Sequence, residues 1–95
     1  MAYRLTRRAR RDVLDIWRHI AADSESVADR FVDRLTHHFQ ILGDVPYAGR
    51  PRDDIRTGYR SFPIGDYLIF YRLREPGIQI MHVVHGRRDL TRYPF

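Results

Sequence analysis

The side chains of this sequence that suit chemistry on a phosphodiester lie in its second half. Cleavage of RNA without a metal needs a group that exchanges protons near neutral pH, and cations that stabilise the pentacoordinate phosphate. Histidine is the one residue type here that titrates near neutrality unaided, and arginine is the cation. The candidates for a metal-independent ribonuclease site are Arg60, Arg72, His85, Arg87, Arg88 and Tyr93.

Structural roles explain the same residues without any catalysis. Arg72 falls within an apolar run, where it can simply pair with Asp66 or Asp89. His85 lies where a predicted strand ends, so its ring nitrogen can cap the following turn. We therefore favour structural or interface roles over catalysis for this set.

A β-hairpin over residues 67–85 is predicted to position these side chains. Two runs of β-branched and aromatic residues flank Glu75-Pro76-Gly77, where proline and glycine favour a reversal of the chain. The second run, 78–85, carries apolar side chains on both faces, and Met81 and Val83 are predicted to share one of them. Alternation in the first run places on one face Tyr67, Ile69, Tyr71 and Leu73, and on the other Leu68, Phe70, Arg72 and Arg74.

Two helices are predicted over residues 7–22 and 24–42. Apolar side chains recur in both at helical spacing. Thr6 and Ser24 are suitable N-cap residues, and Gly43 is expected to end the second helix. The short loop between the helices makes them an antiparallel pair.

The element order β-α-α-β-β-β predicts an α+β fold. Residues 2–5 and 58–64 supply two further strands, and residues 44–57 form a loop. The helical pair then lies on one face of a mostly antiparallel four-stranded sheet, with Trp17 and Phe31 largely buried. One pair of helices covers one face only, so we expect apolar residues of the other face to be exposed for a partner.

The composition indicates one small domain whose stability comes from packing alone. The chain has 95 residues, of which 43% are hydrophobic, and it contains no cysteine for disulfides or thiolate metal sites. No apolar run reaches the roughly 18 residues that span a bilayer, and the first residues lack the apolar segment of a secretory signal. We expect a single cytoplasmic domain, residues 1–95, with no metal and no cofactor.

The positive charge is carried by arginine alone. The net charge is +5, and all 17 basic residues are arginine. Two explanations of this exclusive use of arginine compete. A GC-rich genome would favour arginine codons, which would have no functional meaning. Alternatively, arginine is selected because its planar guanidinium group binds phosphate or carboxylate with two hydrogen bonds. Arg7 and Arg8 stand at the start of a predicted helix, where the helix dipole disfavours cations. This placement favours a surface kept basic for an acidic partner, either nucleic acid or protein.

A set of short motifs follows in a specific order along nearly the whole chain. They are Tyr3-Arg4-Leu5-Thr6, Asp12-Val13-Leu14-Asp15-Ile16, Asp29-Arg30-Phe31, Gly49-Arg50-Pro51, Gly58-Tyr59-Arg60, Tyr67-Leu68-Ile69-Phe70-Tyr71-Arg72 and His85-Gly86-Arg87-Arg88-Asp89. In order and spacing they resemble the ParE/RelE toxin superfamily of bacterial type II toxin–antitoxin systems, nearest its ParE-like branch.

The resemblance implies a toxin that is neutralised by a cognate ParD-like antitoxin. ParE-like members are associated with poisoning DNA gyrase, which makes gyrase the expected target. RelE-like members cleave messenger RNA on the ribosome, and a ribosome-dependent endoribonuclease is the alternative. The absence of lysine favours the ParE-like function, since RelE-like ribonucleases typically use lysines around the substrate.

Two surfaces are expected on such a toxin. The antitoxin is expected to contact Tyr67, Tyr71, Met81 and Val83. Asp89 is predicted to hold Arg87 or Arg60 by a bidentate salt bridge. The segment 90–95 either packs Phe95 back on the body or reaches out to the target. The predicted target-binding residues are Arg60, His85, Arg87, Arg88, Asp89 and Arg92.

Overall fold

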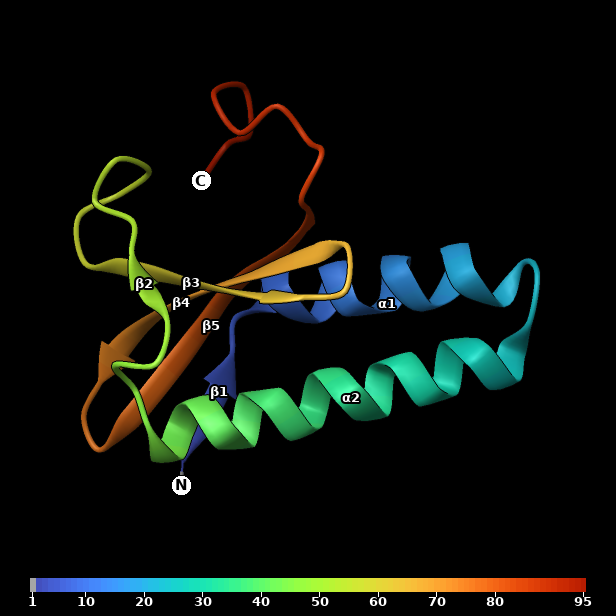
Figure 1. The fold of residues 1–95 in the computed structure, drawn as a ribbon, viewed down its shortest axis with the longest axis horizontal. Coiled ribbons are helices and arrows are strands. Elements are labelled where there is room, and N and C mark those ends of the chain that lie inside the picture. Colours follow the sequence, from blue (N-terminus) through green and yellow to red (C-terminus); the bar gives the residue numbers. More distant parts are fainter. Residues whose placement is uncertain (1) are drawn as a thin grey trace.

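Two helices and five strands make up residues 2–95, the part of the chain that our computed structural model describes (Figure 1). The predicted α+β class is confirmed, with one strand more than the four expected. The extra strand, β2, lies in the stretch predicted as a loop. It was not predicted because a strand of two residues, one of them a proline, leaves no strand pattern in the sequence. The elements are β1 (Tyr3–Leu5), α1 (Arg7–Ala21), α2 (Glu25–Asp44), β2 (Arg50–Pro51), β3 (Tyr59–Ile64), β4 (Tyr67–Arg74) and β5 (Gly77–His85).

The five strands form one sheet in the order β1-β5-β4-β3-β2. The pairs β2–β3, β3–β4 and β4–β5 are antiparallel, whereas β1 runs parallel to β5 with Tyr3 opposite Ile78. A Cβ atom at Gly77 would overlap the carbonyl of Ala2, so glycine there allows the chain before β1 to lie against β5.

Both predicted N-caps are confirmed. The Thr6 hydroxyl accepts a hydrogen bond from the Ala9 amide at 3.0 Å, and the Ser24 hydroxyl accepts one from the Val27 amide at 3.3 Å. The prediction that Gly43 ends the second helix was wrong. It is buried within α2, which continues to Asp44, because close packing on the buried side outweighs the low helix propensity of glycine.

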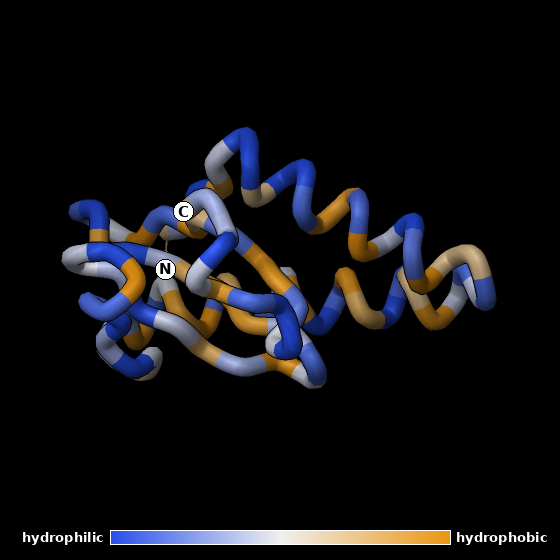
Figure 2. Tube along the Cα trace, turned by 90° about the horizontal axis from the view of Figure 1, so that it is seen from above, coloured by the Kyte–Doolittle hydropathy of each residue, from blue (hydrophilic) through white to orange (hydrophobic). Residues whose placement is uncertain are grey.

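The main core lies between the helices and one face of the sheet. Figure 2 shows hydrophilic and hydrophobic segments alternating along each helix, as expected when one side of a helix is buried. Strand alternation in β4 is as predicted, with Ile69 and Tyr71 on this face and Phe70 on the other. The central buried residues are Ala9, Ile16, Leu35, Phe39, Leu42, Ile69, Tyr71, Ile78, Ile80 and Val83.

Most of Trp17 and Phe31 is covered, as predicted, although neither is as completely buried as the central core residues. The helical pair extends past the sheet, which leaves its loop end covered on fewer sides (Figure 1). Trp17 Nε1 donates to Asp29 Oδ1 at 2.8 Å across the pair. The Phe31 ring packs against Tyr67 with centroids 5.4 Å apart.

The second face of the sheet is covered as well, contrary to expectation. A smaller core of Tyr59, Phe70, Val84 and Tyr93 lies there, because the segment after β5 folds back over the strands (Figure 1). Phe95 packs against this core, with its ring centroid 4.8 Å from that of Phe70. This confirms the alternative in which the end segment packs on the body.

A β-bulge at Met81 changes the direction of the side chains that follow it. Phe70 pairs with His82 and Tyr71 pairs with Ile80, so Met81 is an extra residue in β5. Val83 therefore lies in the main core, and the prediction that Met81 and Val83 share a face was wrong. A bulge leaves no mark on the apolar pattern of a strand that is buried on both sides.

We predict that the main core dominates stability. Replacing Leu35 with alanine removes a fully buried side chain, and should lower the free energy of unfolding by about 2–5 kcal/mol. The matched control is Leu14→Ala on α1, where the side chain is 47% exposed and the loss should stay within about 0.5 kcal/mol. Urea unfolding of both variants measures the difference. Equal losses would contradict this assignment of the core.

Candidate functional site

The six candidate residues for ribonuclease chemistry do not converge on one point. Arg60, on β3, points to the helix side of the sheet and donates to the carbonyls of Gly49 and Tyr47, at 2.9 and 3.3 Å. Its guanidinium group lies over the Tyr47 ring, 5.1 Å from the centroid. Arg60 thus fixes the chain that leads into β2, and the prediction that it joins a cluster with Arg87 was wrong.

Arg72 is bound near the turn of the hairpin. Its Nε donates to Gln79 Oε1 at 3.0 Å, so the predicted pairing with Asp66 or Asp89 was wrong. The two residues face each other across β4 and β5. Gln79 and His85 lie about 18 Å apart along β5, which separates Arg72 from the far end of the strand.

His85 caps the turn after β5, as the structural interpretation predicted. Its Nδ1 accepts a hydrogen bond from the Arg87 amide at 3.1 Å, and its ring lies edge-on to Tyr67 at 5.2 Å between centroids. Asp89 does not hold Arg87 or Arg60, so that prediction was wrong. It accepts bonds from the Thr91 amide and hydroxyl, at 3.0 and 2.6 Å, because these groups are nearer along the chain.

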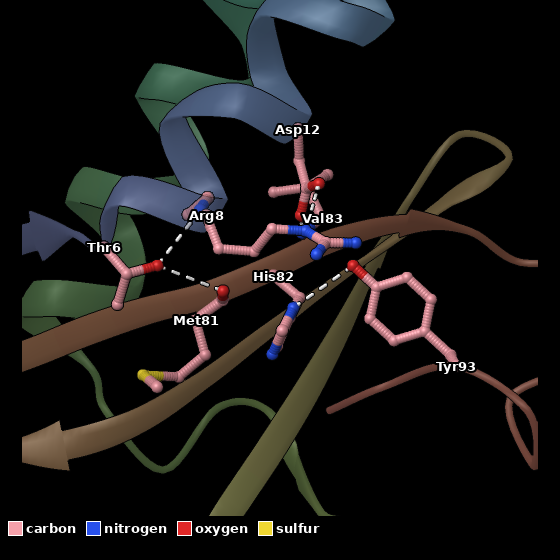
Figure 3. Close-up of polar contacts among 8 residues, drawn as sticks. Thr6, Arg8, Asp12, Met81, His82, Val83 and Tyr93 are labelled. Atoms are coloured by element: carbon pink, nitrogen blue, oxygen red, sulfur yellow. Dashed lines mark hydrogen bonds and ion pairs between the residues drawn. The ribbon is translucent and has the colours of Figure 1, made fainter.

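A polar centre that sequence reasoning missed lies where α1, β5 and the end segment meet (Figure 3). Buried His82 has its Nδ1 3.2 Å from the Tyr93 hydroxyl. Arg8 donates to Asp12 at 3.1 Å, and Asp12 in turn accepts the Val83 amide at 3.0 Å. We call this centre the tail anchor, and its members are Arg8, Asp12, His82, Arg88 and Tyr93.

Two cations complete the tail anchor. The guanidinium carbon of Arg8 lies 5.1 Å from the centroid of the Tyr93 ring, and that of Arg88 lies 4.9 Å from it. Each makes a cation–π contact with the aromatic face. Since Tyr93 is buried against the sheet, its contact holds Arg88 beside the body, although Arg88 is exposed like Arg87 and Arg92. The target-binding residues predicted after β5 therefore lie together, without Arg60.

The tail anchor is uncharged at its centre. Burial lowers the pKa of His82, and the cations Arg8 and Arg56 act in the same direction, whereas Asp12 opposes them. Burial also raises the pKa of Tyr93, which keeps its hydroxyl protonated. A neutral imidazole bonded to a neutral phenol holds the end segment in place, and neither group is set to exchange protons at pH 7.

The residues predicted to bind an antitoxin are mostly covered. Tyr71 is fully buried and its hydroxyl bridges the Gly49 amide and the Pro46 carbonyl, each at 2.8 Å. Burial of Tyr71 and Val83 contradicts the exposed apolar face on which their prediction rested. Met81 is half-buried in the smaller core.

Tyr67 stays accessible beside an apolar groove on α2. It is half-buried and packs on Phe31, which lines the groove together with Val27, whose side chain is 43% exposed. We call this the α2 groove. Its lining residues are Val27, Arg30, Phe31, Asp33, Arg34 and His37.

The described chain, residues 2–95, contains no group of three histidine, cysteine or acidic side chains placed to hold a metal ion. None of the helices in this range has the length and apolar character needed to cross a bilayer.

Comparison with known proteins identifies the family. A family model described as the ParE toxin of type II toxin–antitoxin system, parDE, matches residues 3–90. The chain belongs to this ParE toxin family. Toxin ParE1 of Caulobacter vibrioides is 33% identical over 85 residues, which cover 87% of this chain and 86% of that protein. Toxin ParE1 of Mycobacterium tuberculosis H37Rv is 35% identical over 66 residues, 68% of this chain and 67% of that protein.

The fold of this ParE family member also occurs in a solved structure, the chromosomal ParDE system from P. aeruginosa. The TM-score is 0.75 at 22% identity, and the match covers 90% of this chain and 95% of that chain. At this identity the likeness concerns the fold, and it agrees with the resemblance read from the motif order.

The missed residues had no distinct sequence signal. His82 stands between Met81 and Val83 in a strand that reads as apolar core. Asp12 belongs to a motif that carried the resemblance, but its acceptor role depends on where β5 lies relative to α1. Both roles arise from tertiary contacts, since Asp12 and Val83 are 71 residues apart and His82 meets Tyr93 only because the end segment folds back on the sheet.

We predict that stability falls as the pH is lowered through the range just below 6.5. The unfolded chain protonates His82 first, because its pKa in the folded protein is lowered, so folding loses stability from about pH 6.5 down to the folded pKa. Above about pH 6.5 this contribution is complete. Urea midpoints measured from pH 5 to 8 should show the loss.

The same titration on two variants assigns the effect. His82→Gln should flatten the pH dependence, whatever its stability at pH 8. His19→Gln removes an exposed histidine of α1 and should leave the dependence unchanged. A pH profile that survives in His82→Gln would show that another group causes it.

Proposed function

We propose that this ParE family member inhibits DNA gyrase in the cytoplasm and is neutralised by a cognate ParD-like antitoxin. The observation that supports this most is a group of exposed cations, Arg87, Arg88 and Arg92, on a segment fixed to the body by the tail anchor. A basic surface on a segment that is already packed against the body suits docking to an acidic partner, since less backbone freedom is lost on binding.

The ribonuclease alternative has less support. It needs a proton-exchanging group beside cations that face one phosphate. His85 already accepts a hydrogen bond from the Arg87 amide, and His82 is buried with a lowered pKa. Arg60 and Arg72 are bound elsewhere on the sheet.

The α2 groove is the surface that we propose for the antitoxin. Val27 and Phe31 provide apolar contacts, and Arg30, Arg34 and His37 border them, with Arg34 5.8 Å from the centroid of the Phe31 ring. An amphipathic helix with an acidic rim fits such a groove, because apolar anchors supply affinity and opposite charge speeds association. The half-buried Tyr67 extends the groove to the sheet.

We predict that toxicity depends on cations after β5 and little on His85. Arg87→Glu should restore most growth after induction, because a favourable contact with an acidic target becomes repulsive. His85→Ala should leave growth arrest nearly intact, since docking needs no proton carrier. Plasmid supercoiling and message integrity are followed in the same cultures.

Arg74→Glu is the matched control for this experiment. It makes the same charge change at an exposed position on β4, near the hairpin turn, and should stay toxic. Cleavage of ribosome-bound messages within minutes, lost together with growth arrest in His85→Ala, would establish the ribonuclease instead.

We predict that the product of the neighbouring antitoxin gene binds tightly at the α2 groove. Val27→Glu places a charge among apolar contacts and should weaken binding at least tenfold, with little effect on folding because the side chain is exposed. The control Val45→Glu alters another exposed valine, 50% exposed and outside the groove. Titration calorimetry decides: equal affinities for the two variants would place the antitoxin elsewhere.

A further inference from the structure

The outer side of α1 carries a dense row of arginines. Arg7, Arg11 and Arg18 follow one another at intervals of about one and two turns, on the side opposite buried Ala9 and Ile16. Arg10 lies beside this row, and the same surface is lined by Leu14 and Asp15. We call this the α1 outer face.

Little within the protein neutralises these cations. Arg7, Arg10 and Arg11 are exposed, and their guanidinium groups form no ion pair or hydrogen bond with any residue in the range 2–95. Arg18 approaches Asp15 at 4.0 Å, with both side chains more than 60% exposed. The first turn of α1 contains no acidic residue, although the helix dipole favours one there.

We propose that the α1 outer face binds the phosphate backbone of duplex DNA. This goes beyond gyrase inhibition and antitoxin binding, and it does not depend on either. From Arg7 to Arg18 the row is about 16 Å long at 1.5 Å per residue. A duplex of that length carries roughly nine phosphates, so the row meets enough negative charge on one side of the DNA.

The residue types on this face favour duplex DNA over other acidic partners. A protein partner gains its affinity from buried apolar anchors, and Leu14 is the one apolar side chain on the α1 outer face. Single-stranded nucleic acid needs aromatic side chains for base stacking, and this face of α1 carries none. Contacts with duplex phosphates need only exposed cations at regular spacing.

The probe is a fluorescein-labelled 24-base-pair DNA duplex of mixed sequence, titrated with the full chain and followed by anisotropy from 50 to 200 mM salt. Four phosphate contacts predict a slope of about −3.6 for log affinity against log salt. Replacing Arg7, Arg10 and Arg11 together by glutamine should reduce the slope to about −0.9 and weaken binding more than tenfold at 50 mM salt.

The matched control replaces three exposed arginines elsewhere, Arg4, Arg50 and Arg74, by glutamine. It lowers the net charge equally and should change affinity less than threefold. Circular dichroism checks that both triple variants are folded, as expected because glutamine is a good helix former at the three α1 positions and the control positions are exposed.

Several results would overturn the proposal. The first is absence of duplex binding by the unmodified chain at 50 μM in 50 mM salt. The second is equal weakening of both triple variants, which would mean attraction by net charge alone. The third is tighter binding, through the same arginines, of a 24-residue polyglutamate or of the single-stranded 24-mer, which would assign the face to a protein or to unpaired nucleic acid.

Discussion

The rest of the structure depends on how β5 satisfies the backbone groups of its edge beyond the end of β1. β1 ends at Leu5, whereas β5 continues, so backbone groups on that edge lack a neighbouring strand. Residues at the start of α1 take the place of that strand. The Thr6 amide donates to the Ile80 carbonyl at 3.0 Å, and the Thr6 hydroxyl donates to the Met81 carbonyl at 3.1 Å. Asp12 accepts the next free amide, that of Val83, two turns into the helix. Unpaired buried backbone groups are costly, so these bonds determine both the position of α1 and the side that it turns to solvent.

The same contacts connect the helix to the far side of the sheet. Because Asp12 is held at β5, Arg8 is held one turn earlier, with its guanidinium group over the Tyr93 ring. Tyr93 in turn bonds His82, which follows the bulge in β5. The end segment therefore contacts α1 as well as the strands. These contacts fix the position of the segment that carries the cations after β5. A pair of helices that covers one face thus also contributes to closing the other.

Local pattern was sufficient for the helices, for the hairpin and for the order of all elements except the two-residue β2, because each of these rests on periodicity and caps close in sequence. The family was recognisable for the same reason, since its motifs keep their order. The bulge at Met81 was not predictable: a strand apolar on both faces gives no register signal, and one extra residue reverses the direction of Val83. The covering of the second face was not predictable either, because segment 90–95 has no periodicity of its own. The antitoxin-contact prediction for Met81 and Val83 failed because of these two features, whereas the pairing expected for Asp89 failed because Thr91 lies nearer along the chain.

The arginines of this chain fall into two groups with different causes. Arg52 is buried, donates to Asp54 through Nε and a terminal nitrogen at 3.1 and 3.2 Å, and lies 5.5 Å from the centroid of the Phe70 ring. A bidentate bond combined with a flat contact on a ring requires a planar guanidinium, so lysine would not serve there. Codon bias is therefore unnecessary to explain this group. Arg7 and Arg11 make no such contact, and their position near the start of a helix opposes the dipole. Their charge is not neutralised within residues 2–95, so it is available to an acidic molecule outside the chain, as the proposed contact with duplex DNA requires.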